Sequence, residues 1–247
     1  MTTMELTRDL VVEVVPNIRH LGGYRTRDGR ETTCTPLVRS ASLHRLSAGG
    51  IAALADSGVK TVVDLRSGME RERDVTPDLA PFGIVTVHAP VFESDASPVG
   101  QDPRDFPGYA VVYERMLASG QPAYRRLFET VAEAEGGVLF HCAVGKDRTG
   151  VGAALMLSVA GVSEADVIAD YERSEGLLAH LFAEMLPRMQ ERGIDEALGR
   201  RLMAAPAADM AAMLAHIDRT WGSAEGYLLD IGVSTGALSA VRARLVG

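Results

Sequence analysis

Residues 149–160 constrain the fold of this chain most, because they are apolar nearly all round and a helix formed there must be buried. The short apolar run at residues 137–141 comes just before this helix and predicts a buried strand. Further runs rich in β-branched residues predict strands at residues 10–15, 60–65 and 84–88. Strands that alternate with helices favour an α/β fold, with a central, largely parallel sheet flanked by helices.

Helices are predicted between these strands and throughout the C-terminal half of the chain. Ser47 can cap the first helix, and Gly58 ends it. Residues 93–108 contain three prolines and three aspartates and predict a long polar loop, a feature that is usually functional or disordered. Apart from the buried helix, the predicted helices are residues 48–57, 107–119, 121–135 and 163–174, and a last helix that follows Ser234.

The charge balance argues against a nucleic-acid-binding protein. The chain has 247 residues and a formal net charge of −8, and it contains no long basic run. Nucleic-acid binders carry a positive stripe, so we expect no such partner. An anionic substrate would have to be attracted by a local positive site, because the overall field of the protein is negative.

Cysteine usage and hydropathy indicate the compartment. The two cysteines, Cys34 and Cys142, are too few for a disulfide framework and make a reducing compartment the default. The N-terminal segment lacks the basic, apolar and cleavage regions of a signal peptide. The longest nearly apolar segment, residues 150–162, is too short to span a bilayer. We expect a cytoplasmic location by default and no transmembrane segment, although signal-independent secretion is compatible with the sequence.

The sequence HCAVGKDRTG, residues 141–150, lies where the buried strand passes into the buried helix. Backbone N–H groups at such a junction point into a concavity, and the helix N-terminus adds partial positive charge. A loop of this kind binds an oxyanion of the size of phosphate. Gly145 permits a close approach of the backbone, and Gly150 allows the helix to pack closely on the sheet.

Cys142 lies at the entrance of this loop and is exposed to the same field. Helix N-termini and nearby cations favour the thiolate, which is the reactive form of cysteine. We therefore expect the sulfur to be ionised at neutral pH. His141 is expected to hold the loop through a hydrogen bond, and Thr149 is expected to donate a hydrogen bond to the sulfur. The alternative, a cysteine that is only a small buried hydrophobe, does not explain the neighbouring residues.

Arg148 follows Cys142 by six residues, and its planar guanidinium suits bidentate capture of two phosphoryl oxygens. Phosphoryl transfer develops negative charge on those oxygens, which the loop amides and Arg148 would stabilise. Cys142 would attack phosphorus in line and leave a thiophosphate for water to hydrolyse. We expect no metal and no other cofactor, because no His, Cys and Asp cluster with metal-ligand spacing is present.

The sequence resembles the bacterial branch of atypical tyrosine and phosphoinositide phosphatases, within the cysteine-dependent protein tyrosine phosphatase superfamily. The resemblance runs from about residue 14 to the C-terminus, so we expect residues 1–247 to form a single catalytic domain. His20 and Glu175 depart from the branch, which usually has Asp and Asn at these positions. The matching segments are the loop itself, residues 17–25 (NIRHLGGYR), 64–67 (DLRS), 167–174 (VIADYERS), 221–223 (WGS) and 231–234 (IGVS).

The resemblance implies a role for each residue of the loop. Cys142 is expected to be the nucleophile and Arg148 the phosphate clamp. Lys146 and Asp147 distinguish this branch from ordinary tyrosine phosphatases, and Lys146 suits a multiply phosphorylated ring unless it is only an exposed loop lysine. The implied ligands are phosphate or another oxyanion, and the implied substrates are a phosphorylated protein or a phosphoinositide. The remaining substrate-binding positions are His141, Ala143, Val144, Gly145 and Thr149.

The general acid has three candidates. The acid must be a carboxyl group within hydrogen-bond reach of the ester oxygen. Asp147 lies in the loop and fits this branch, so we favour it. Asp95 is the second choice and Glu93 the third, because they lie in the long polar loop where most members of the superfamily place the acid. Each could instead be a carboxylate of an exposed loop.

Three further predictions concern residues outside the loop. Residues 177–189 carry apolar side chains at helical spacing, which is typical of an ordinary core-packing stripe. The resemblance to a mycobacterial member of the branch implies instead that residues 175–205 form a helical lid over the active site. Arg66 is expected to pair with Glu70 or Glu72 rather than face the site. Cys34 is a minor candidate for a thiol that resolves oxidised Cys142.

The leading function is hydrolysis of phosphate monoesters, with phosphotyrosine proteins as the first expectation and phosphoserine, phosphothreonine and phosphoinositides as further substrates. The alternative from another class is a catalytically silent phosphate-binding module. A third reading is a rhodanese-like or arsenate-reducing thiol enzyme. The Arg148-Thr149-Gly150 ending of the loop disfavours this third reading.

Overall fold

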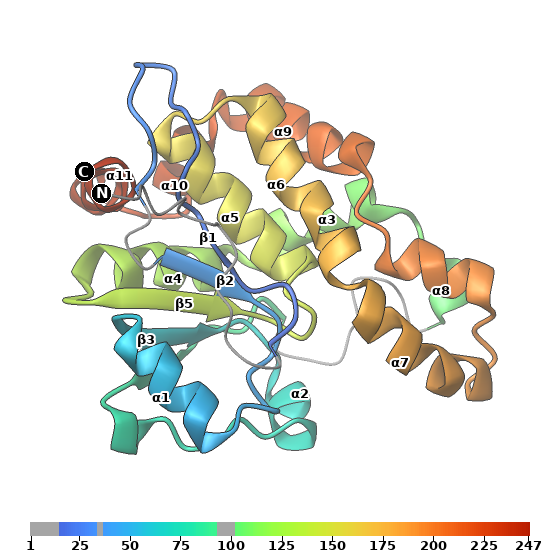
Figure 1. Cartoon of the computed structure of the whole chain (residues 1–247). Coiled ribbons are helices and arrows are strands. Elements are labelled where there is room, and N and C mark those ends of the chain that lie inside the picture. Colours follow the sequence, from blue (N-terminus) through green and yellow to red (C-terminus); the bar gives the residue numbers. More distant parts are fainter. Residues whose placement is uncertain (1–14, 34–36, 93–101) are drawn as a thin grey trace, which may run out of the picture.

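The computed structural model describes residues 15–33, 37–92 and 102–247 (Figure 1). Its five strands are β1 (Arg19–His20), β2 (Leu37–Ser40), β3 (Val59–Asp64), β4 (Val85–His88) and β5 (Gly137–His141). They form a single sheet in the order β1-β2-β5-β3-β4. All neighbouring pairs are parallel except β1 with β2, which are antiparallel. The sheet confirms the α/β class with a largely parallel sheet.

The strands predicted at residues 60–65, 84–88 and 137–141 are present within one residue of the expected bounds. The strand predicted at 10–15 lies outside the described residues except for Val15, which is not in a strand. The sequence analysis missed β1 and β2. Strand β2 is buried along its whole length but is short and half polar, so it has no apolar pattern to detect.

The predicted helices are all present. Helix α3 begins only at Tyr109, because Gly108 has a φ of 93° and interrupts the helical backbone. The buried helix begins at Asp147, two residues earlier than predicted. The helices are α1 (Ala48–Asp56), α2 (Gly68–Arg73), α3 (Tyr109–Ser119), α4 (Gln121–Glu133), α5 (Asp147–Ala160), α6 (Glu164–Leu177), α7 (Ala179–Glu191), α8 (Glu196–Met203), α9 (Ala207–Trp221), α10 (Ala224–Asp230) and α11 (Thr235–Val246).

Two apolar clusters cover the two faces of the sheet. In the central strand, Val138 and Phe140 belong to the larger cluster and Leu139 to the smaller one, as the two-residue repeat of a strand requires. The larger cluster contains the buried residues of α5 and of the helices around it, and the smaller one packs under α1. Figure 1 shows α1 on one side of the sheet and α4, α5 and α6 on the other. Helix α5 is buried along almost its whole length, as predicted.

The strand register brings three strand ends together. His141, the last residue of β5, is paired with Ser40 of β2 on one side and with Asp64 of β3 on the other. Because these strands are parallel, the segments that follow them emerge at the same edge of the sheet. The loop after β5 therefore lies between the segments that follow β2 and β3.

Candidate active site

The loop of residues 142–146, which we call the phosphate loop, joins β5 to α5 at this edge. Gly145 has a φ of 69°, a backbone conformation that favours glycine. A Cβ atom at this position would lie 2.3 Å from the carbonyl oxygen of Ser40 at the end of β2. No side chain fits there, so glycine is required both by the backbone conformation and by the close contact with β2.

Two side chains hold the carbonyl groups of the loop from outside. Asn17 donates from Nδ2 to the carbonyl oxygens of Gly145, at 2.8 Å, and Val144, at 3.1 Å. Arg39, from β2, donates to the same Gly145 oxygen at 2.9 Å. The C=O and N–H groups of a trans peptide unit point in opposite directions. The N–H groups of Gly145 and Lys146 therefore point away from Asn17 and Arg39, toward the inside of the loop.

A buried ion-pair network supports these two tethers. Asp170, on α6, accepts hydrogen bonds from Arg19 at 2.9 Å and Arg39 at 2.5 Å, and from the hydroxyl of Tyr24 at 2.9 Å. Burial alone would raise the pKa of Asp170, but the charges of the two arginines hold it well below its usual range. The sequence analysis gave none of these residues a role, although an arginine inside the buried strand β2 is a signal that it needs a buried partner.

Cys142 directly follows β5 as the first residue of the phosphate loop, is only 1% exposed, and belongs to the larger apolar cluster. His141 contacts the Cys142 carbonyl oxygen through Nδ1 at 3.1 Å, so it touches the loop as expected. Burial lowers the pKa of His141, which favours the neutral ring, although the charge of Asp64 opposes this. The Thr149 hydroxyl is buried and has no hydrogen-bond partner among the described residues, so the predicted bond to the sulfur is not formed in this structure.

Arg148 is held by a carboxylate from the neighbouring strand end. Its two terminal nitrogens donate to the two carboxylate oxygens of Glu70, on α2, at 2.5 and 2.7 Å. Burial would raise the pKa of Glu70, but the hydrogen bond and charge of Arg148 lower it to about 2. Glu70 also closes a capping box with Ser67 at the start of α2, which fixes the carboxylate. The guanidinium is thus oriented by two parallel hydrogen bonds.

The predicted partners of Arg66 are wrong. Arg66 pairs with Asp64, at 2.7 Å, and also donates to Ser42 and Thr76, so it is a buried structural residue. Arg66 follows Asp64 by two residues, and its guanidinium folds back onto the Asp64 carboxylate. Glu70 is consequently free to orient Arg148.

Lys146 and Asp147 lie side by side at the start of α5. Lys146 is completely buried, so the alternative of an exposed loop lysine is wrong. Burial lowers its pKa, and the charge of Asp147, whose carboxylate is 3.4 Å from the ammonium, opposes that change. Asp147 also accepts a hydrogen bond from the hydroxyl of Tyr113 at 2.8 Å. The Tyr113 hydroxyl in turn lies 2.5 Å from that of Tyr171.

Helices α7 and α8, within the segment predicted as a core pair or a lid, form a helical hairpin at one end of the molecule (Figure 1). No residue of α7 is buried. Arg45, in the segment after β2, pairs with Glu184 of α7 at 2.9 Å. That segment adjoins the phosphate loop, because the Ser42 N–H donates to the Ala143 carbonyl. The hairpin is therefore not an element of the main core and is linked to the rim of the loop.

Three of the predicted residues, Asp95, Glu93 and Cys34, lie outside the described residues. Among residues 15–33, 37–92 and 102–247, no three His, Cys, Asp or Glu side chains are grouped as metal ligands. No helix in the same part of the chain is long and apolar enough to cross a membrane.

Comparison with known proteins identifies the class to which this fold and site belong. Residues 10–247 match the model of the tyrosine phosphatase family, and the chain is a member of that family. This confirms the predicted enzyme class, a phosphatase acting on phosphoric monoesters.

Three relatives of this chain are bacterial proteins. A Cupriavidus necator protein that carries the name of a tyrosine-protein phosphatase is 33% identical over 231 residues, which cover 90% of this chain and 83% of that protein. A tyrosine-protein phosphatase of Nostoc commune is 32% identical, over 84% of this chain and 73% of its own length. The triple specificity protein phosphatase PtpB of Mycobacterium tuberculosis is 30% identical, over 92% of this chain and 98% of its own length.

Proposed function

We propose that this protein hydrolyses phosphate monoesters through a cysteinyl-phosphate intermediate. The Cys142 thiolate would attack phosphorus, forming the S–P bond as the bond to the ester oxygen breaks. The leaving oxygen would take a proton from a carboxylic acid. Water would then attack phosphorus and release inorganic phosphate, which restores the thiolate. The observation that carries this proposal is the phosphate loop itself, which begins with the buried Cys142 and whose Gly145 carbonyl is held from outside by Asn17 and Arg39.

Arg148 is the proposed clamp for the phosphoryl group. Its paired hydrogen bonds to Glu70 use one edge of the guanidinium and fix its plane. A fixed guanidinium stabilises the charge on the equatorial oxygens without first having to be ordered. This arrangement supports Arg148 as a catalytic residue and Glu70 as a positioning residue.

Asp147 is the proposed general acid. Its carboxyl group lies at the first position of α5, one residue before Arg148, and is partly exposed. The Tyr113 hydroxyl holds one carboxyl oxygen, which supports a fixed orientation. Asp95 is the alternative general acid. The two candidates are distinguished by replacing each with Asn and measuring the rate of hydrolysis of esters with good and with poor leaving groups. Only loss of the true acid penalises poor leaving groups selectively.

Phosphotyrosine proteins are the proposed principal substrates, with phosphoserine, phosphothreonine and phosphoinositides as further classes. The name of the mycobacterial relative, a triple specificity phosphatase, supports this breadth. We also propose that the α7–α8 hairpin is a lid over the phosphate loop, supported by the contact between Arg45 and Glu184. A reducing, cytoplasmic location suits an enzyme whose nucleophile is a thiolate.

The test is turnover of para-nitrophenyl phosphate by the parent protein and by Cys142→Ser. We expect the variant to lose activity while keeping its fold and its affinity for inorganic phosphate. Equal turnover by both proteins would refute the cysteine mechanism. Phosphate binding without turnover by the parent would instead identify the alternative, a silent phosphate-binding module.

A further inference from the structure

Lys146 has an unusual environment for the lysine of an anion-binding loop. Its side chain is completely buried, and Nζ lies 3.8 Å from the centre of the Tyr109 ring. Nζ donates to the carbonyl oxygens of Leu202 at 3.0 Å and Ala204 at 2.8 Å, and it lies 3.4 Å from the Asp147 carboxylate. An ammonium has three N–H donors. These three acceptors satisfy all of them within the protein.

Two of the three acceptors belong to the end of the α7–α8 hairpin. Leu202 is in the last turn of α8, and Ala204 is its C-cap residue. The last carbonyl groups of a helix have no partner inside the helix and carry partial negative charge, so a cation is favoured there. The Tyr109 hydroxyl donates to the same Leu202 oxygen. Lys146 of the phosphate loop thus supplies the positive charge that pairs with the free carbonyl groups at the C-terminus of α8.

The end of α6, which leads into the hairpin, is hydrogen-bonded to the residue that follows the C-cap of α8. Glu175, near the end of α6, accepts a hydrogen bond from the Ala205 N–H at 3.0 Å. The negative charge of Glu175 is also one of the influences that favour the charged form of Lys146. Both ends of the hairpin therefore meet beside Lys146.

Within residues 15–33, 37–92 and 102–247, the other polar contact between the hairpin and the loop region is an exposed ion pair. The Arg45–Glu184 pair is half exposed, at 49% and 41% for the two side chains, and exposed ion pairs contribute little to stability. Leu178 and Met203 are buried but belong to neither of the two main apolar clusters. Among the described residues, the contact of Lys146 with α8 is a buried polar link between the hairpin and the phosphate loop, whereas the Arg45–Glu184 pair is exposed.

We propose that Lys146 is a clasp whose ammonium fastens the α7–α8 hairpin to the phosphate loop, and that a substrate with a second phosphate group competes with α8 for this ammonium. When the hairpin is docked, Lys146 has no N–H left for a substrate. A monophosphate ester would be bound with the hairpin in place, whereas a multiply phosphorylated ligand would draw Lys146 away and release α8. The second part of this inference rests on the proposed function, and the first part does not.

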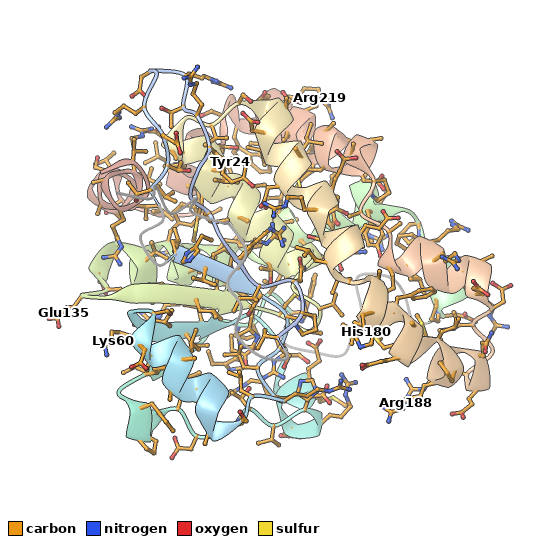
Figure 2. All side chains as sticks on the ribbon, viewed as in Figure 1. Tyr24, Lys60, Glu135, His180, Arg188 and Arg219 are labelled. Atoms are coloured by element: carbon orange, nitrogen blue, oxygen red, sulfur yellow. The ribbon has the colours of Figure 1, made fainter. Side chains whose placement is uncertain are left out.

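Amide hydrogen exchange of Lys146→Met tests the clasp. Methionine keeps the length of the side chain but leaves the Leu202 and Ala204 carbonyls without a donor. We expect exchange in α7 and α8 to accelerate on the order of tenfold to a hundredfold, with β5 and α5 unchanged. The matched control is Lys60→Met, which replaces the only other lysine of the chain. Lys60 is exposed on β3 and lies far from α7, as Figure 2 shows by its distance from His180 and Arg188.

Two results of this experiment would overturn the clasp. One is unchanged exchange in the hairpin of Lys146→Met. The other is faster exchange throughout the fold, which would make Lys146 a general structural residue. Because exchange requires no turnover, either result leaves the test with para-nitrophenyl phosphate unaffected.

The competition is tested on Cys142→Ser, which we expect to bind ligands without turnover, with inorganic phosphate and inositol 1,4,5-trisphosphate as probes. We expect both probes to slow exchange of the loop amides at 143–146, and only the trisphosphate to accelerate exchange in α8. In Lys146→Met the trisphosphate should have no further effect on α8. Protection of the loop without a change in α8, or failure of the trisphosphate to protect the loop at all, would overturn the competition.

Discussion

Glu70→Gln isolates the contribution of one carboxylate to the orientation of Arg148. Glutamine keeps the size of the side chain and an oxygen for Ser67, but it removes the charge that faces the guanidinium. Glu70 is only 19% exposed and Arg148 13%, so solvent screens the pair weakly. The pair therefore acts nearly as a buried one, and loss of one charge leaves the other without compensation.

The magnitude follows from the pKa of Glu70, which is lowered from 4.5 to about 2. Each pKa unit corresponds to 1.36 kcal/mol, so the ionised carboxylate is favoured in the folded state by about 3 kcal/mol. A group with a lowered pKa stabilises the fold above its unfolded value, and the stabilisation is lost as the pH falls through the folded value. The window in which Glu70 loses this contribution is therefore pH 4.5 down to about 2.

Urea unfolding of the parent and Glu70→Gln across this window is the assay. At pH 7 we expect the variant to be less stable by about 2–3 kcal/mol, and the difference should shrink steadily below pH 4.5. We also expect kcat/KM for para-nitrophenyl phosphate to fall by about tenfold to a hundredfold, because the guanidinium loses its fixed plane. A stability difference that is the same at pH 7 and pH 3, or unchanged kcat/KM, would refute this reasoning.

Three further variants test the site. Asp147→Asn should lower kcat more for phenyl phosphate than for para-nitrophenyl phosphate, and an equal loss for both esters would exclude it as the acid. Arg39→Met leaves Asp170 with one fewer cation, and thermal unfolding should show a loss of about 3–5 kcal/mol; a loss below about 1 kcal/mol would contradict the supporting network. Gly145→Ala places a Cβ 2.3 Å from the Ser40 oxygen, so calorimetry should show loss of phosphate binding, and retained binding would contradict the proposed loop.

The local features of this site could be predicted from the sequence. The strand, the loop and the buried helix occupy consecutive residues, 137–160, and the apolar pattern of these residues predicts each of them. Cys142 and Arg148 were predicted in this way, because both lie in the same ten-residue segment. Their placement needs only the junction of one strand with one helix, and the predicted bounds of β5 were correct.

The supporting residues could not be predicted, because their partners are distant in the chain. Glu70 and Arg148 are 78 positions apart, and Arg39 and Asp170 are 131 apart. Only the order of strands in the sheet brings them together, and the short strand β2 gave no apolar signal. Lys146 illustrates the same limit. Two of its three acceptors, Leu202 and Ala204, lie 56 and 58 positions away, so the sequence suggested a substrate contact where the structure has a contact with α8.

The covalent step is the centre of this account, and the phosphorylated enzyme tests it most directly. The parent protein would be mixed with a phosphotyrosine peptide, quenched in acid within the first turnover and digested for mass spectrometry. The account predicts one added phosphoryl group on the peptide that contains residue 142, located on sulfur, and none in Cys142→Ser. Rapid turnover with the phosphoryl group on another side chain, or with no phosphorylated enzyme at any quench time, would contradict it.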